Sequence, residues 1–396
     1  MGGHRAVAAT MAVLIVTGAG CSSSVSRPAA QHRASIAESA RTRSCPPAPP
    51  THHREPAPWP SRTVLRESPM DAGTRQVVDP AAGAVFLLAS ETNTPERGPW
   101  ALCRISLATG RARLGQTFPV SDLAMASGYL WVYSAGRTSA QPVTVSQVSP
   151  VTLARIRPIP LPRAPANFGL PAAVTAGPTG SVWIGYDRTL LRVDAATGHI
   201  LARITLPPGL AVSNDAVAAS GTALYAASTH IAKDGGMAGA VMLEYDARSG
   251  RKLAEASGGL LRYSAAGAEL TAVPGGVWAS FRTGMMGLTI HLGANGLRML
   301  TPPGPRIGLT PPNSVFHWPM YATTGYGGGA LWVANQASIV ACLDPRTGTV
   351  LAGEHLPLGQ YIFGFEAIDP ASRTIFASSG YGGGLLQITP PRRCWH

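Results

Sequence analysis

Residues 173–207 read AVTAGPTGSVWIGYDRTLLRVDAATGHILARITLP. Four short apolar runs alternate here with turn residues. The first ends at Gly177, the second contains Trp183, the third ends at Asp194, and the fourth follows Gly198. Glycine supplies the positive φ that a tight turn needs, and an Asp side chain can hydrogen-bond the turn backbone. The stretch therefore predicts four β-strands joined by short turns.

The aromatic run of this stretch recurs seven times between residue 76 and the C-terminus. The copies lie about 48 residues apart on average, close to the length of a four-stranded propeller blade and longer than a helical-pair repeat. They are AVFLLAS at Phe86, YLWVYS at Trp131, SVWIGY at Trp183, ALYAAS at Tyr225, GVWASF at Trp278, ALWVAN at Trp332 and TIFASS at Phe376.

Flanking segments complete each unit. An Ala/Val-rich run and a turn precede most copies, and a third run ending in Thr-Gly or Ser-Gly follows them. Fourth strands are expected in HILARITLP (199–207) and TVLAGEHLP (349–357). The third runs are RISLATG (104–110), RVDAATG (192–198), EYDARSG (244–250) and CLDPRTG (342–348).

This pattern resembles that of the YVTN/NHL-type β-propeller superfamily, and the resemblance covers residues 62–396. It implies an all-β, seven-bladed propeller with four-stranded blades. The seventh copy, ending at ITPP (388–391), has no fourth strand of its own. We expect Thr63–Glu67 to supply that strand and close the ring, because closure removes an exposed sheet edge.

The N-terminus has the features of a targeting segment. Met1–Arg5 carries one Arg, Ala6–Val16 is apolar but shorter than the roughly 20 residues that span a bilayer, and small residues precede Cys21. Small residues before a Cys resemble the bacterial lipobox, which implies that Cys21 is diacylated and that residues 1–20 are a lipoprotein signal peptide. The protein is then anchored on the extracytoplasmic side of the cell membrane; simple secretion is the alternative.

Residues 21–61 are expected to form a disordered tether before the propeller of residues 62–396. This segment is rich in Pro, Ser and Ala and has few bulky apolar residues, so it cannot bury enough surface to offset the entropy of ordering. Over the whole chain, 45 Gly, 35 Pro and 13% charged residues argue against long amphipathic helices. Basic residues are nearly all Arg, which suggests a GC-rich genome and a lipoprotein of the actinobacterial type.

Loop lengths indicate which face carries function. We call the face with the first-to-second and third-to-fourth turns of each blade the lower face, and the face with the other connections the upper face. The lower turns are short. The insertions Glu91–Pro99, Thr229–Gly239 and Pro302–Pro319 all fall on the upper face, where binding residues are expected on a rigid scaffold.

Acidic residues recur where the inner strands are expected to start. Four of the seven aligned residues are acidic, and converging carboxylates can bind a hard divalent cation such as Ca²⁺ or Mg²⁺, or attract a cationic ligand. They can equally stay hydrated in the channel or bond a neighbouring blade, and an acid/base pair is a third alternative. The aligned residues are Gln76, Asp122, Ala172, Asp215, Glu269, Tyr321 and Glu366.

Aromatic residues suggest two different roles. One per blade at a fixed strand position predicts packing between sheets. In the upper-face insertion, however, His317, Trp318 and Tyr321 cluster beside the expected mouth. These three residues are candidates for ligand recognition, and a loop folded over its own blade is the alternative.

Four cysteines remain besides Cys21, an even number that suits disulfides in an oxidising compartment. Cys45, Cys103, Cys342 and Cys394 allow three pairings. The predicted blades of Cys103 and Cys342 are not adjacent, which argues against joining those two.

Enzyme motifs are mostly absent: the sequence has no HExxH, no P-loop and no GxSxG at a strand-to-helix turn. Streptogramin B lyase is a similar propeller that uses a His, but no His occupies an inner-strand start here. The leading interpretation is a monomeric, non-catalytic binding or scaffold module for a protein, peptide or glycan, with a metal-dependent hydrolase or lyase as the alternative. Nucleic-acid binding is disfavoured despite the net charge of +12, because the Arg residues are dispersed.

Overall fold

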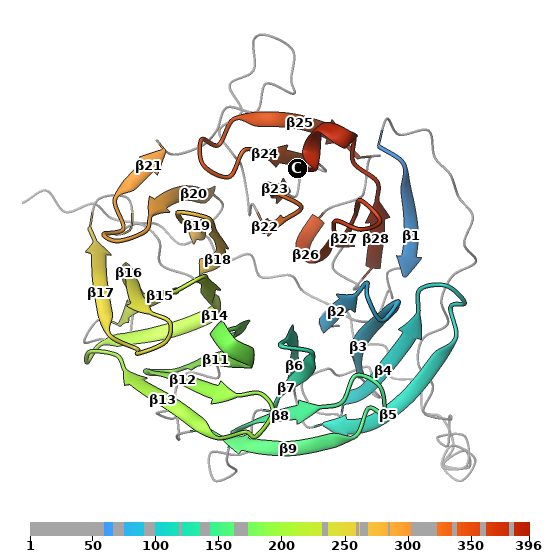
Figure 1. Cartoon of the computed structure of the whole chain (residues 1–396), viewed down its shortest axis with the longest axis horizontal. Helices are drawn as coiled ribbons and strands as arrows, with labels where there is room; N and C mark the ends of the chain where they lie inside the picture. Colours follow the sequence, from blue (N-terminus) through green and yellow to red (C-terminus); the bar gives the residue numbers. More distant parts are fainter. Residues whose placement is uncertain are drawn as a thin grey trace, which may run out of the picture. The chain divides into compact units, whose positions relative to one another are not determined.

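The computed structural model consists of seven four-stranded antiparallel sheets arranged around a ring (Figure 1). All described residues belong to one compact unit, residues 43–396. No helix in this described part is long and apolar enough to cross a membrane. The structure describes residues 59–65, 75–90, 100–118, 121–134, 143–161, 173–231, 237–258, 261, 268–283, 286–301, 323–334, 339–356, 362–379 and 384–396.

Each sheet is one blade, and the seven inner strands line the centre of the ring (Figure 1). The inner strands are β2 (Arg75–Asp79), β6 (Ser121–Ala126), β10 (Ala173–Ala176), β14 (Leu210–Ser220), β18 (Ala268–Val273), β22 (Thr323–Gly327) and β26 (Ile362–Asp369). The second strands are β3 (Ala84–Ser90), β7 (Tyr129–Ser134), β11 (Ser181–Tyr186), β15 (Ala223–Ile231), β19 (Gly276–Thr283), β23 (Ala330–Ala334) and β27 (Thr374–Ser379). They begin where the seven aromatic copies begin.

The third strands are β4 (Trp100–Ser106), β8 (Thr144–Val148), β12 (Thr189–Asp194), β16 (Met237–Asp246), β20 (Met286–Gly293), β24 (Ile339–Leu343) and β28 (Gly384–Ile388). The outer strands are β5 (Ala112–Phe118), β9 (Arg155–Pro160), β13 (Ile200–Thr205), β17 (Lys252–Ser257), β21 (Met299–Thr301), β25 (Val350–His355) and β1 (Ser61–Leu65). Two short 3-10 turns, η1 (Pro178–Gly180) and η3 (Arg392–Cys394), complete the described elements.

The N-terminal strand closes the ring, as predicted, but it spans Ser61–Leu65 rather than Thr63–Glu67. β1 pairs antiparallel with β28, with Ser61 opposite Ile388, so the seventh blade takes its outer strand from the start of the chain. Trp59, just before β1, is buried in the core formed with blades 6 and 7. Inner strand β26 also contacts β2, which joins blade 7 to blade 1.

The aromatic of each second strand is packed between blades, as predicted, with at most 2% of its surface exposed. Two of the indoles also bond the next blade. Trp183 Nε1 donates to the carbonyl of Ala247 at 3.2 Å, and Trp278 Nε1 donates to that of Pro345 at 2.9 Å. A buried Trp needs such an acceptor for its N–H group. The aromatic column therefore supplies apolar contact and fixed hydrogen bonds between blades.

A second column of side chains stands opposite these aromatics on the third strands. Most members are polar, and several reach the third-to-fourth turn of the following blade. Gln147 donates to the carbonyl of Ala195, and Arg192 donates to that of Arg248 at 2.8 Å. We call this set the third-strand column: Arg104, Gln147, Arg192, Glu244, His291, Cys342 and Gln387.

Blades 4 and 5 are joined by a fully buried carboxylate. Glu244 Oε1 accepts the backbone N–H of Asn295 at 2.8 Å, and Oε2 accepts that of Gly296 at 3.1 Å. In blade 5 the column residue is His291, which stacks on Trp278 with ring centroids 4.6 Å apart. Burial lowers the pKa of His291, so its neutral form is favoured.

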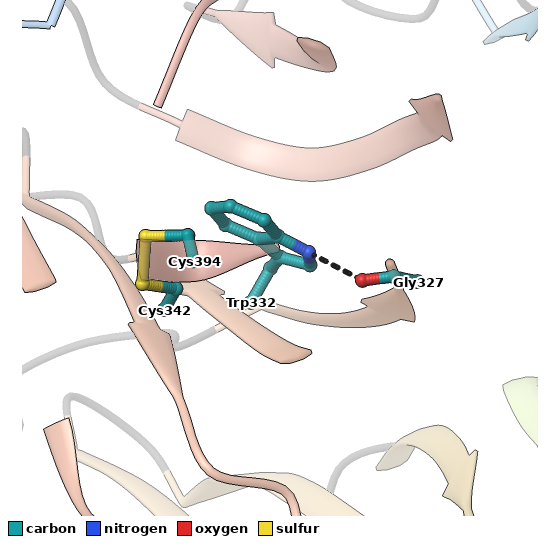
Figure 2. Close-up of a disulfide and its surroundings, with 4 residues drawn as sticks. All are labelled: Gly327, Trp332, Cys342 and Cys394. Atoms are coloured by element: carbon teal, nitrogen blue, oxygen red, sulfur yellow. Dashed lines mark hydrogen bonds between the residues drawn. A yellow bond between two sulfur atoms is a disulfide. The ribbon is translucent and has the colours of Figure 1, made fainter. Parts of the chain in front are cut away.

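In blade 6 the column position is a cysteine, and a covalent bond replaces the hydrogen bond. Cys342 pairs with Cys394 of the C-terminal segment, beside Trp332 (Figure 2). Trp395 then lies 5.0 Å from Trp332, centroid to centroid. Cys103 is also disulfide-bonded, to a residue outside the described ranges. The expectation that Cys103 and Cys342 are not joined is confirmed.

The C-terminal segment accounts for the glycine-rich run Gly325–Gly329, which in sequence resembles a phosphate-binding loop. A Cβ on Gly328 would lie 2.3 Å from the Trp395 ring, and one on Gly329 would lie 2.7 Å from His396. The backbone N–H of His396 donates to the Gly328 carbonyl at 2.9 Å. These glycines make room for the chain end, as no larger side chain could.

The lower face carries the short turns, as expected. In blade 4, the N–H of Ala247 in the third-to-fourth turn donates to Thr222 in the first-to-second turn at 2.6 Å, so the two turns lie together. In blade 3, Asp194 Oδ1 accepts the N–H of Thr197 at 2.7 Å, and Gly198 has φ of 75°. The Asp-to-Gly turn chemistry is confirmed.

The upper face differs in part from the prediction. Thr229–Gly239 is largely a continuation of strands β15 and β16, which makes this hairpin longer than its neighbours. Thr229 pairs with Ala240 and Ile231 pairs with Met237, with a register shift between the two pairs. Glu91–Pro99 and Pro302–Pro319 lie outside the described residues.

Candidate functional site at the upper mouth

The upper ends of the inner strands form the mouth where acidic residues were expected. Asp122 pairs with Tyr133, and Glu269 pairs with Ser280. In each blade, another inner-strand residue pairs with the aromatic of the second strand, and the acidic residue lies two positions before it. These two carboxylates therefore occupy equivalent positions in blades 2 and 5. Both are half-buried.

Three other aligned residues, Gln76, Asp215 and Glu366, do not share that position, so the alignment was wrong there. Gln76 lies one residue nearer the lower face. Asp215 falls within a register shift between Val212 and Val217, and Glu366 falls between Phe365 and Ala367 in another. Irregularities in a strand insert residues without a partner, so equal spacing in sequence is not equal spacing in the sheet.

Several candidates cannot be located. The side chain of Asp215 lies outside the described residues, as do Ala172, His317, Trp318 and Tyr321. Glu366 is half-buried on β26. Cys21, the predicted lipidation site, also lies outside the described part of the chain.

Glu269 bonds the neighbouring blade. Its Oε1 accepts the hydroxyl of Thr323 at 2.6 Å and the backbone N–H of Thr324 at 3.1 Å. Below it, the hydroxyls of Thr271 and Thr324 are 2.9 Å apart. This is the structural role that the sequence left open for an inner-strand carboxylate. It joins blades 5 and 6 at the mouth.

Asp122 belongs to a group at the junction of blades 2 and 3. Tyr133 and Tyr186, from the second strands of these blades, have ring centroids 6.0 Å apart. Burial raises the pKa of Tyr133, and the hydrogen-bonded Tyr186 and the charge of Asp122 raise it further. The Tyr133 phenol therefore stays protonated near neutral pH and acts there as a hydrogen-bonding group.

At the junction of blades 1 and 7, the aligned residue is the amide Gln76. It is buried, and its Nε2 donates to the carbonyl of Gly384 at 3.0 Å. Gln76, Asp122 and Glu269 thus lie at blade junctions and are not isolated groups in the channel.

A metal site needs several His, Cys, Asp or Glu side chains close together. Among the described side chains, no three His, Cys, Asp or Glu residues are grouped so as to hold a metal ion. Asp122, Glu269 and Glu366 therefore do not form a three-carboxylate site by themselves. A cation at the mouth would need Asp215 or further donors.

Sequence reasoning missed the third-strand column and the two tyrosines. The column had a usable signal in blades 3, 4 and 6, where its member lies two residues before the turn aspartate, as Arg192 does before Asp194. Tyr133 lies two residues after the Trp of YLWVYS, and Tyr186 lies three residues after the Trp of SVWIGY, so the aligned copies do not place them together. Their meeting depends on how adjacent blades twist, which a single sequence does not give.

Comparisons with known proteins find the fold but no family. No family model and no curated protein matches the chain. Among solved structures, U3-55K is 11% identical, with a TM-score of 0.53 over 82% of this chain and 100% of that one. The Pan2 WD40 domain of Neurospora crassa is 10% identical, with a TM-score of 0.51 over 80% and 89%. BamB from Moraxella catarrhalis is 15% identical, with a TM-score of 0.49 over 80% and 82%. The chain is thus similar in fold to WD40-type β-propellers.

Proposed function

We propose that this protein is a membrane-tethered extracytoplasmic propeller that acts as a non-catalytic binding or scaffold module. Its ligand is a protein, peptide or glycan held at the upper face. The β-propeller scaffold is compatible with such a role, but a fold shared by many functions does not choose among them. Which face is available to a ligand depends on the face at which the chain enters the ring.

The direction of β1 carries the proposal. Ser61 pairs with Ile388, the lower end of β28, and the N–H of Thr389 donates to the Pro60 carbonyl at 2.8 Å. The chain therefore enters the propeller at the lower face. Trp59 and Ser61 already belong to the propeller. A lipid on Cys21 and a tether that ends before Trp59 would hold the protein by that face and leave the upper mouth directed away from the bilayer.

The upper mouth offers groups suited to recognition. Asp122, Glu269 and Glu366 are half-buried there, and the long β15–β16 hairpin of blade 4 extends on the same face. We propose that Asp215, His317, Trp318 and Tyr321 complete the ligand site. Converging carboxylates would favour a ligand with a cationic group.

Two measurements test this function. Cys21→Ser should remove the acyl mass and release the protein from the membrane fraction, or leave it held by an uncleaved signal; unchanged mass and fraction would rule out the anchor. Titration with Ca²⁺, Mg²⁺, Mn²⁺ and Zn²⁺ should leave the melting temperature unchanged. Stabilisation by about 2.7 kcal/mol at a hundredfold excess over Kd, lost in Glu269→Gln or Asp122→Asn, would instead favour the metal-dependent hydrolase or lyase.

A further inference from the structure

The outer strands share a repeated irregularity near their lower ends. In blade 3, Arg192 pairs with Ala202 and Val193 pairs with Ile200, which leaves Leu201 without a partner. The same shift occurs in blades 2, 4, 5 and 6, always at the second residue of the outer strand. The extra residue is apolar every time: Ile156, Leu201, Leu253, Leu300 and Leu351.

Four of these five side chains are open to solvent. Their exposed fractions are 43%, 50%, 38% and 50% for Ile156, Leu201, Leu253 and Leu300. Leu351 differs because it belongs to a core cluster with Trp395, and η3 of the C-terminal segment packs on β25. Among the described residues, the bulge side chain is therefore covered in blade 6, where the C-terminal segment packs over it. In blades 2 to 5 the same position presents an apolar side chain outward.

Exposed cationic residues lie one or two positions along the chain from each of these four side chains. They are scattered singly in the sequence, but the repeat brings them to the same level of successive blades. Among turn carboxylates nearby, Asp194 and Asp246 are already bonded to their own turns. On β17, Lys252 pairs with Glu255, and the Arg155 guanidinium lies 5.1 Å from the centroid of the Phe118 ring. The exposed cations are Arg155, Arg203, Arg251, Lys252 and Arg298.

We propose that this arc, which we call the lower rim, docks on an anionic lipid bilayer. Apolar tips flanked by Arg and Lys suit the headgroup region, where the tips enter the acyl boundary and the cations meet lipid phosphates. Single tips, one per blade, do not form the contiguous buried centre that a protein interface needs. The entry of β1 at the same face agrees with this orientation, but the inference does not depend on acylation of Cys21.

The test uses the chain from Ser22 onward, which has no acyl group and keeps every contact described above. Its sedimentation with phosphatidylcholine vesicles containing about 30% phosphatidylglycerol is compared with that on pure phosphatidylcholine, at about 0.1 M and 0.5 M salt. The apolar variant carries Ile156→Ser, Leu201→Ser, Leu253→Ser and Leu300→Ser. A matched charge pair is Arg298→Gln on the lower rim and Arg188→Gln, in the upper turn of blade 3.

The proposal expects binding to the anionic vesicles alone, weakened by high salt and reduced about tenfold or more in the apolar variant. Arg298→Gln should weaken binding more than Arg188→Gln. The melting temperatures of the apolar variant and of Arg298→Gln should match that of the unaltered chain, because the side chains substituted in them are exposed. Arg188 is half-buried and donates to the Leu206 carbonyl at 2.9 Å, so Arg188→Gln controls for the loss of a charge and not for stability. Absence of vesicle binding would overturn the proposal. Vesicle binding that is unchanged in the apolar variant would also overturn it. So would binding to heparin or RNA that equals vesicle binding and is not reduced by the apolar substitutions, since either result indicates a purely electrostatic polyanion site.

Discussion

Glu244 offers a direct test of how the blades are held together. Its carboxylate is fully buried and accepts two backbone N–H groups from the third-to-fourth turn of blade 5, at 2.8 and 3.1 Å. A hydrogen bond to a charged group contributes about 1.5–3 kcal/mol. Glu244→Ala removes both bonds, leaves both donors unpaired and opens a cavity. We expect it to lower the free energy of unfolding by about 3–5 kcal/mol.

Glu244→Gln should be milder, because the amide oxygen keeps one bond while the amide N–H₂ faces the second donor; the expected loss is about 2 kcal/mol. Urea denaturation followed by tryptophan fluorescence measures both. The matched control is Glu255→Ala on β17, whose exposed carboxylate pairs with Lys252, with an expected effect below about 0.5 kcal/mol. If Glu244→Ala cost no more than Glu255→Ala, the third-strand column would not be a stabilising feature.

Three further predictions concern the remaining contacts. Cys394→Ser opens a loop of 52 residues and should cost about 4 kcal/mol on chain entropy; an unchanged unfolding midpoint without reductant would contradict this. The Thr197 backbone and hydroxyl bonds lower the pKa of Asp194, so its contribution to stability is present above about pH 4 and is lost as the pH falls through the depressed folded-state pKa. Asp194→Asn should therefore make the acid-induced drop in melting temperature shallower, and an identical pH profile would count against that reasoning. Glu269→Gln should cost about 1–3 kcal/mol, because two donors of blade 6 lose an ionised acceptor; a variant more stable than the parent would mean that carboxylate repulsion dominates at the mouth.

Local chemistry made much of the fold predictable. An aromatic with flanking apolar residues specifies a buried strand, and Asp with Gly specifies its turn, so Trp183 and Gly198 were placed correctly from sequence. Closure by β1 followed from counting strands. Register was harder, because the irregularities around Asp215 and Glu366 insert residues with no separate signal. The sequence therefore predicted acidic residues at the upper mouth, but it did not predict which strand positions they share.

Contacts between blades could not be predicted from the sequence, for a different reason. The repeat shows which positions are equivalent, but it does not show that Glu244 faces the turn of the next blade. Nor does it show that Cys342 meets Cys394 rather than another cysteine. Such pairings depend on the twist that brings adjacent sheets together.

In the proposed arrangement, the upper face meets the partner while the lower face meets the membrane. Ser257 at the upper end of β17 and Arg248 in the lower turn of the same blade are both exposed. A photo-cross-linking amino acid placed at either position, in cells that make the full chain, compares the two faces within one blade. We predict a protein or glycan adduct from position 257 and a lipid adduct from position 248. A protein adduct from position 248 with none from position 257 would contradict the account.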